Sequence, residues 1–161
     1  APALDNAGFV VREVYSRSRK NASALVHKLY QAELKTDLDF SDSASRVFFL
    51  TVSDDALPDI LQEIILPDNA IIVHTSGSQP LRILARAATL NMGVFYPLQT
   101  FSKQKKVDFA ELPIFIECEN QDVEKQLMKM AKAISKKVLS IDSTKRAALH
   151  VAAVYASNFT N

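Results

Sequence analysis

Five short apolar runs, each followed by small polar residues, constrain the fold of this chain more than any other feature. The runs are Phe9–Tyr15, Val47–Val52, Ala70–Val73, Val94–Tyr96 and Ile114–Ile116. Stretches with a helical spacing of apolar residues separate most of them. Parallel strands are joined by crossover connections, which are usually helices. The pattern therefore predicts an α/β fold with a three-layer, mostly parallel, doubly wound sheet.

Hydroxyls, a histidine and acidic side chains follow these runs. The carboxyl ends of parallel strands meet at one edge of a sheet, and open α/β sheets bind their ligands at that edge. We therefore expect the polar side chains after all five runs to gather along one edge. The sequence predicts a site for a small-molecule substrate there.

Length, charge and cysteine content exclude several classes of protein. A chain of 161 residues can bury the core of one ordinary domain. Its net charge of +1 provides no basic field for a nucleic acid. The single Cys118 excludes an internal disulfide framework and fits a reducing compartment. No apolar run has the length of a membrane span and no signal peptide is visible, so we expect a cytoplasmic protein with no membrane or nucleic acid partner.

The helices can be placed from their apolar spacing. Helices are expected over 1–8, 20–31, about 57–65, after Pro80, over 122–137 and from Ser143 to the chain end, with further strands around Leu38 and over 138–141. Asp54 or Asp55 is expected to cap the helix that follows it. Ser143 or Thr144 is expected to cap the last helix, and Gly93 to end the one after Pro80. Because the chain opens and closes within helices, we expect a piece of a longer polypeptide whose first strand is missing.

A basic turn, with Ser16, Arg17 and Ser18 followed by Arg19 and Lys20, ends the first run. In a dinucleotide-binding fold the end of the second strand meets the adenosine ribose. An acid there binds the 2′-hydroxyl, whereas arginine and hydroxyls accommodate a 2′-phosphate. If the chain binds a dinucleotide, these residues predict NADP. The alternative is a serine-capped basic turn on a solvated surface.

Small polar residues also follow the second and third runs. After the second, Val52, Ser53 and Asp54 would let a cofactor lie across the backbone; the alternative is helix capping by Asp54. After the third, His74 and Ser76 can shape a site for an anion or a carbonyl, with His74 as acid, base or donor. The alternative there is an ordinary strand-to-helix turn.

Weaker signals come from the fourth run and from the remaining reactive residues. Gln99 and Thr100 offer donors to a pocket, or simply form a turn after Pro97. The three histidines and Cys118 show no metal-ligand spacing, so no metal site is predicted. The Gly-x-Ser-x-Gly sequence of serine hydrolases is absent, so no serine nucleophile is expected.

Three strings, VHTSGS, YPLQTFS and AALHVAAVYASNFTN, resemble a family of NADP oxidoreductases related to pyrroline-5-carboxylate reductase and to the deazaflavin-dependent NADP reductases. The resemblance implies a Rossmann-like domain over residues 1–142 and, over residues 143–161, the first helix of an all-helical domain. The family has a glycine-rich turn before its first helix, which this chain lacks. Because that turn lets the backbone approach a pyrophosphate, a chain without it is expected to bind a dinucleotide weakly or not at all.

The resemblance also implies a reaction and a set of residues. The reaction is hydride transfer between the nicotinamide of NADP and a small carbonyl, imine or hydroxy compound. The implied sites are Ser16, Arg17 and Ser18 for the 2′-phosphate, Val52, Ser53 and Asp54 for the nicotinamide half, Ser76, Gln99 and Thr100 for substrate, and His74 and Asn158 for catalysis. A homodimer through the helical domain is implied as well. The alternative function is a non-catalytic nucleotide-sensing or dimerisation module with the same fold.

Overall fold

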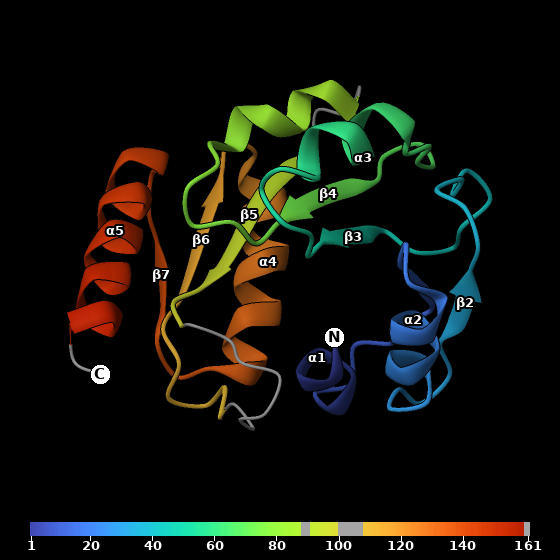
Figure 1. Cartoon of the computed structure of the whole chain (residues 1–161), viewed down its shortest axis with the longest axis horizontal. Helices are drawn as coiled ribbons and strands as arrows, with labels where there is room; N and C mark the ends of the chain where they lie inside the picture. The colour runs from blue at the N-terminus through green and yellow to red at the C-terminus, as the bar shows by residue number, and fades with distance from the viewer. Residues whose placement is uncertain (88–90, 100–107, 160–161) are drawn as a thin grey trace.

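The computed structural model describes residues 1–87, 91–99 and 108–159 (Figure 1). The helices are α1 (Pro2–Asn6), α2 (Arg19–Val26), α3 (Leu57–Glu63), α4 (Gln121–Ile134) and α5 (Ser143–Phe159), with a 3-10 helix η1 (Leu81–Ala87). The strands are β1 (Glu13–Tyr15), β2 (Glu33–Lys35), β3 (Val47–Leu50), β4 (Ile71–His74), β5 (Met92–Pro97), β6 (Ile114–Cys118) and β7 (Val138–Ser140). Among these residues no helix combines the length and apolar character needed to cross a membrane.

Most of the strand pairings are parallel. β1 and β2 form a parallel pair, and the other strands form one sheet in the order β3-β4-β5-β6-β7. Within this sheet β3, β4 and β5 run parallel, and so do β6 and β7, whereas β5 and β6 are antiparallel. The predicted α/β fold with a mostly parallel sheet is therefore confirmed.

Helices cover both faces of the five-stranded sheet, with α3 and η1 on one side and α4 on the other (Figure 1). Leu50 and Ile72 point toward α3 and η1. Ile71, Val73 and Phe95 point toward α4. Every residue of β4 is buried, because a central strand with helices on both faces needs apolar side chains at every position.

The sheet is split between β1 and β3. No ladder joins the described strands of the two pieces. They are connected by Ser43 and Ser45, which both donate to the Glu13 carboxylate, and by an isolated backbone bridge between Asp39 and Ile65. In the Rossmann strand order the first strand lies between the second and the fourth. The split therefore agrees with the prediction of a Rossmann-like sheet that lacks its first strand.

The direction of β6 corrects one prediction. β6 runs antiparallel to β5, so the chain leaves β6 toward the starts of β4 and β5, although Glu117 near its end lies level with His74 at the end of β4. Cys118 at the end of β6 pairs with Gly93 near the start of β5, and Asn120 lies within hydrogen-bond distance of Asn91. An antiparallel pair needs no crossover, so the chain can return directly from β5 into β6.

Several element boundaries also differ from the predictions. β1 keeps only the end of its predicted run, and α2 ends at Val26 rather than near Gln31. The strand predicted around Leu38 lies at Glu33–Lys35, while Leu38 itself packs in the core. Gly93 lies inside β5 instead of ending a helix. Tertiary packing, which local propensity does not report, sets these positions.

The predicted helix caps are wrong. α3 begins after Ala56 with no side-chain cap, so neither Asp54 nor Asp55 caps it. Asp142 caps α5 by accepting a backbone hydrogen bond of 2.8 Å from its first turn, one residue before the predicted Ser143. α5 starts where the helical domain is expected to start, and the division into two domains stays a prediction.

Leu127→Ala should lower the free energy of unfolding by about 2–5 kcal/mol. Leu127 is fully buried on α4 and occupies the space that Gly93 leaves above β5. Urea denaturation would measure the loss. The matched control, Lys129→Ala on the exposed face of the same helix, should change stability by less than about 0.5 kcal/mol. Equal effects of the two substitutions would contradict this packing.

Candidate functional site

Hydrogen bonds within the loop between β4 and η1 make it compact. The Ser76 backbone N–H donates to His74 Nδ1 at 3.2 Å. The Ser76 hydroxyl accepts from the backbone N–H groups of Ser78 at 3.2 Å and of Gln79 at 3.0 Å. Serine side chains form such local bonds readily, and here they shape a turn at the end of β4.

The same loop is joined to the end of β3. The Ser78 hydroxyl donates to Asp54 Oδ2, and this bond takes up the carboxylate that was expected to cap α3. Val52 and Ser53 precede Asp54 in the sequence and are exposed, and the apolar side chain of Val52 is 42% accessible. The structure thus brings together Asp54 and the loop that carries Ser76 at the carboxyl ends of β3 and β4.

A buried ion pair lies behind the loop. Arg146 of α5 is 1% exposed and pairs with Glu117 of β6, with 2.9 Å between Arg146 Nη2 and Glu117 Oε2. The same guanidinium donates to the carbonyl oxygens of Ser76 at 2.8 Å, Gly77 at 3.1 Å and Gln79 at 2.8 Å. The loop backbone therefore folds around a side chain that lies far from it in the sequence.

A tyrosine and a histidine meet beside this ion pair. The Tyr96 hydroxyl of β5 lies 2.9 Å from His150 Nδ1 of α5, and their rings make an edge contact. Gly77 packs directly against both, since a Cβ built on it would lie 2.6 Å from His150 Cγ and 2.8 Å from Tyr96 Cζ. Only a residue without a side chain fits there, because the loop backbone at position 77 lies directly against the side chains of His150 and Tyr96.

His74 is a buried neutral histidine at physiological pH. Burial, together with the charge of Arg146, lowers its pKa from 6.5 to about 4, against smaller opposing effects of the Pro80 carbonyl and Asp54. Because Nδ1 accepts from Ser76, the proton of the neutral ring lies on Nε2, which makes no hydrogen bond within the described ranges. The catalytic role of His74 stays a prediction, and its 1% exposure favours a part in holding the loop.

The basic turn lies in the other piece of the sheet. Ser16, Arg17 and Ser18 follow β1, in the two-stranded piece, and Ser18 caps α2 by accepting from the Asn21 backbone N–H at 3.3 Å. Arg17 is exposed, and the first turn of α2 contains no acid. An accessible guanidinium, two hydroxyls and a helix N-terminus without a competing carboxylate fit the 2′-phosphate of NADP.

The remaining predicted residues lie at the ends of β5 and α5. Gln99 is exposed just after β5. Thr100 and the side chain of Asn158 lie outside the described residues. None of the roles assigned to these three residues is tested by the structure, and they stay predictions.

Four residues of this site are not predicted from the sequence: Glu117, Arg146, Tyr96 and His150. The available signal was an arginine and a histidine four residues apart within an otherwise apolar helical stretch. Such a spacing places two polar side chains on one helix face. The pattern could not show that this face turns toward the loop after β4.

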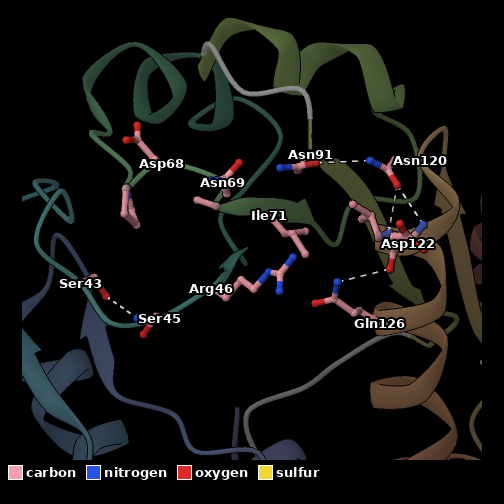
Figure 2. Close-up of a pocket in the computed structure, with 13 residues that line it drawn as sticks. Ser43, Ser45, Arg46, Asp68, Asn69, Ile71, Asn91, Asn120, Asp122 and Gln126 are labelled. Atoms are coloured by element: carbon pink, nitrogen blue, oxygen red, sulfur yellow. Dashed lines mark hydrogen bonds between the residues drawn. The ribbon is translucent and has the colours of Figure 1, made fainter.

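The larger of two described cavities, of about 530 Å³, lies at the opposite edge of the sheet (Figure 2). Arg46 before β3, Asn69 before β4, and Asp122 and Gln126 of α4 line it. Within it Asn120 accepts from the Asp122 N–H at 2.9 Å. None of its described lining residues has a buried side-chain nitrogen or oxygen without a hydrogen-bond partner, whereas the carboxyl edge brings Asp54 together with the loop that carries Ser76.

Comparisons with known proteins show which proteins this chain resembles. The profile of a domain of unknown function, DUF2520, matches residues 112–161. No curated protein matches the chain. The crystal structure of a "putative NADP oxidoreductase", BF3122 from Bacteroides fragilis, is 38% identical, with a TM-score of 0.86 over 99% of this chain and 62% of that one. This chain is therefore similar to that protein over almost its whole length.

Two further solved structures share the fold of this chain. Protein TM1727 from Thermotoga maritima is 24% identical, with a TM-score of 0.75 over 98% of this chain and 60% of that one. An imine reductase from Myxococcus stipitatus in complex with NADP+ is 15% identical, with a TM-score of 0.71 over 98% of this chain and 57% of that one. The chain thus spans less than two thirds of each of these proteins.

The free energy of unfolding should fall as the pH is lowered from about 6.5 to about 4, because His74 has a lower pKa in the folded chain than in the unfolded chain. The loss should reach about 3 kcal/mol. The unfolded chain binds a proton at the ordinary histidine pKa, whereas the folded chain binds it only near pH 4. The contribution is therefore complete above pH 6.5 and lost as the pH falls through this window.

Urea denaturation at several pH values would measure this slope. His74→Asn keeps an acceptor for the Ser76 N–H and should flatten the profile. His27→Asn, at an exposed histidine, should leave the profile as it is. Parallel profiles for the wild type and His74→Asn would contradict the burial of a neutral His74.

Gly77→Ala should destabilise the protein by about 1–3 kcal/mol, because the added methyl group overlaps His150 and Tyr96. Thermal unfolding followed by circular dichroism would measure the change. In a His150→Ala background the same substitution should cost less, because the larger overlap is with the imidazole. An equal cost in both backgrounds would exclude this contact as the cause.

Proposed function

We propose that the full-length protein is an NADP-dependent oxidoreductase. The observation that carries the proposal is the 38% identity to the Bacteroides fragilis protein over 99% of this chain, since the name of that protein states both the reaction class and the cofactor. The NADP+ complex of the more distant imine reductase is consistent with the same cofactor. When bound, NADP supplies hydride transfer, and the protein supplies binding and orientation.

The residues that would hold the cofactor lie at strand ends in both pieces of the sheet. Arg17, with Ser16 and Ser18, would bind the adenosine 2′-phosphate through charge-assisted hydrogen bonds. The exposed Val52 and Ser53, next to Asp54, would face the nicotinamide half. An accessible apolar side chain at a strand end suits the face of a nicotinamide ring.

The substrate would lie beside the loop after β4, near Ser76 and Gln99. Thr100 and Asn158 are further residues proposed to bind or act on it. A small carbonyl, imine or hydroxy compound fits a site made of hydroxyls and amides. His74 is neutral above pH 6.5, so it would act as a hydrogen-bond donor or as support for the loop rather than as a permanent cation. A homodimer formed through a helical domain is part of the same proposal.

Arg17→Glu should weaken NADPH binding to the full-length protein by about 10- to 100-fold, because one charge-assisted contact is lost and a repulsion is added. Binding of NADPH and NADH would be measured by fluorescence titration. The wild type should prefer NADPH, and Arg17→Glu should abolish that preference. Lys28→Glu, an equal charge change at an exposed position beyond α2, is the control and should keep it.

Equal affinity of the wild type for the two dinucleotides would contradict the role of Arg17. Oxidation of NADPH with a panel of small ketones, keto acids and imines tests the reaction itself. Tight NADPH binding without turnover of any compound would favour the nucleotide-sensing module.

A further inference from the structure

Arg146 makes contacts that no role in cofactor binding explains. The side chain is 1% exposed, and its donors reach two different partners at once. On one side Nε and Nη2 lie 3.3 and 2.9 Å from the Glu117 carboxylate. On the other, Nη1 and Nη2 donate to carbonyl oxygens of the loop between Ser76 and Gln79. We propose that Arg146, with Glu117 as its counter-ion, is the positioning residue that fixes this loop for substrate.

The direction of the loop follows from these bonds. Three of its carbonyl oxygens, from Ser76, Gly77 and Gln79, accept from the guanidinium and so point toward α5. The hydroxyl of Ser78 lies on the β3 side, where it donates to Asp54. With its carbonyl groups held in this way, the loop keeps its serine hydroxyls at the edge of the sheet.

A second contact from the same helix strengthens this arrangement. His150 lies four residues after Arg146 and therefore on the same face of α5. It touches Gly77 of the loop and hydrogen-bonds the Tyr96 hydroxyl. Two consecutive turns of α5 thus contact one loop, and α5 and the loop keep one relative position.

Two of the residues proposed for the site lie on these two elements. Ser76 belongs to the loop, and Asn158 lies farther along α5. Their separation depends on how α5 is docked, and Arg146 carries the largest set of hydrogen bonds described between the two elements. This inference rests on the proposed function, because a role in substrate binding presupposes the proposed reaction. It gives Arg146 no part in cofactor binding.

A lysine cannot replace this arginine. The planar guanidinium presents donors in a fixed fork that serves the carboxylate and the carbonyl groups on opposite sides. The lysine ammonium is a compact point charge on a flexible stem and cannot span both. Arg146→Lys keeps the charge that Glu117 requires and removes the fork, so it separates positioning from charge balance.

Amide hydrogen exchange tests the proposal without a known substrate. In Arg146→Lys the amides of residues 76–79 should exchange about tenfold faster, as expected for the loss of about one hydrogen bond, while the amides of α4 keep their rates. The matched control is Lys145→Met, one residue earlier on α5 with a side chain that is 76% exposed. It should change neither set of amides.

Glu117→Gln is the second variant in case Arg146→Lys does not fold. It keeps an oxygen for the Ser143 hydroxyl, which donates to Glu117 at 2.6 Å, and removes only the counter-charge. Its loop amides should also exchange faster than those of α4. Equal acceleration in the loop and in α4, or no acceleration in the loop, would overturn the proposal.

Steady-state kinetics with the compound that the wild type reduces completes the test. Arg146→Lys should lower kcat/KM about 10- to 100-fold, mainly through the substrate KM, and leave the Kd of NADPH within about twofold. A parallel loss of NADPH binding would overturn the positioning role. If the wild type reduces no compound, the proposed function fails, and the exchange experiment alone decides whether Arg146 fixes the loop.

Discussion

The buried pair of Arg146 and Glu117 is the interaction on which the arrangement of the site depends. Removing two charges from water is costly, and their mutual attraction offsets this only if their remaining donors and acceptors are also satisfied. Here the loop after β4 supplies the acceptors and Ser143 supplies a donor. The pair therefore stabilises the protein only when β6, α5 and the loop are assembled together. Arg146 of α5 contacts both of the other two elements.

Close backbone approach is the second constraint. Gly77 lets the loop lie against the Tyr96–His150 pair, and Gly93 lets α4 lie close to β5. At both positions a side chain would hold the two packed elements apart, and glycine has none. The first of them acts at the carboxyl edge of the sheet, so packing and site geometry are set by the same contacts.

The proposed site extends over both pieces of the sheet. The basic turn with Arg17 follows β1 in the two-stranded piece, while Asp54 and Ser76 follow strands of the five-stranded sheet. A dinucleotide is long enough to extend across a sheet edge and pass both places. In the proposed arrangement Arg17 would distinguish the two cofactors, and the loop held by Arg146 would contact the substrate. The two tasks would then use separate elements and could be altered independently.

The sequence by itself determined the α/β class, the mostly parallel sheet and the composition of the basic turn. Continuous apolar runs, helical spacing and the residues after a strand are local properties, so they can be read without the fold. Only the tertiary structure decided that β6 runs antiparallel, that Asp54 binds Ser78 instead of capping a helix, and that Arg146 reaches the loop. Each of these joins residues distant in the sequence, and a charged or hydroxyl side chain bonds to whichever partner the packed chain brings within reach.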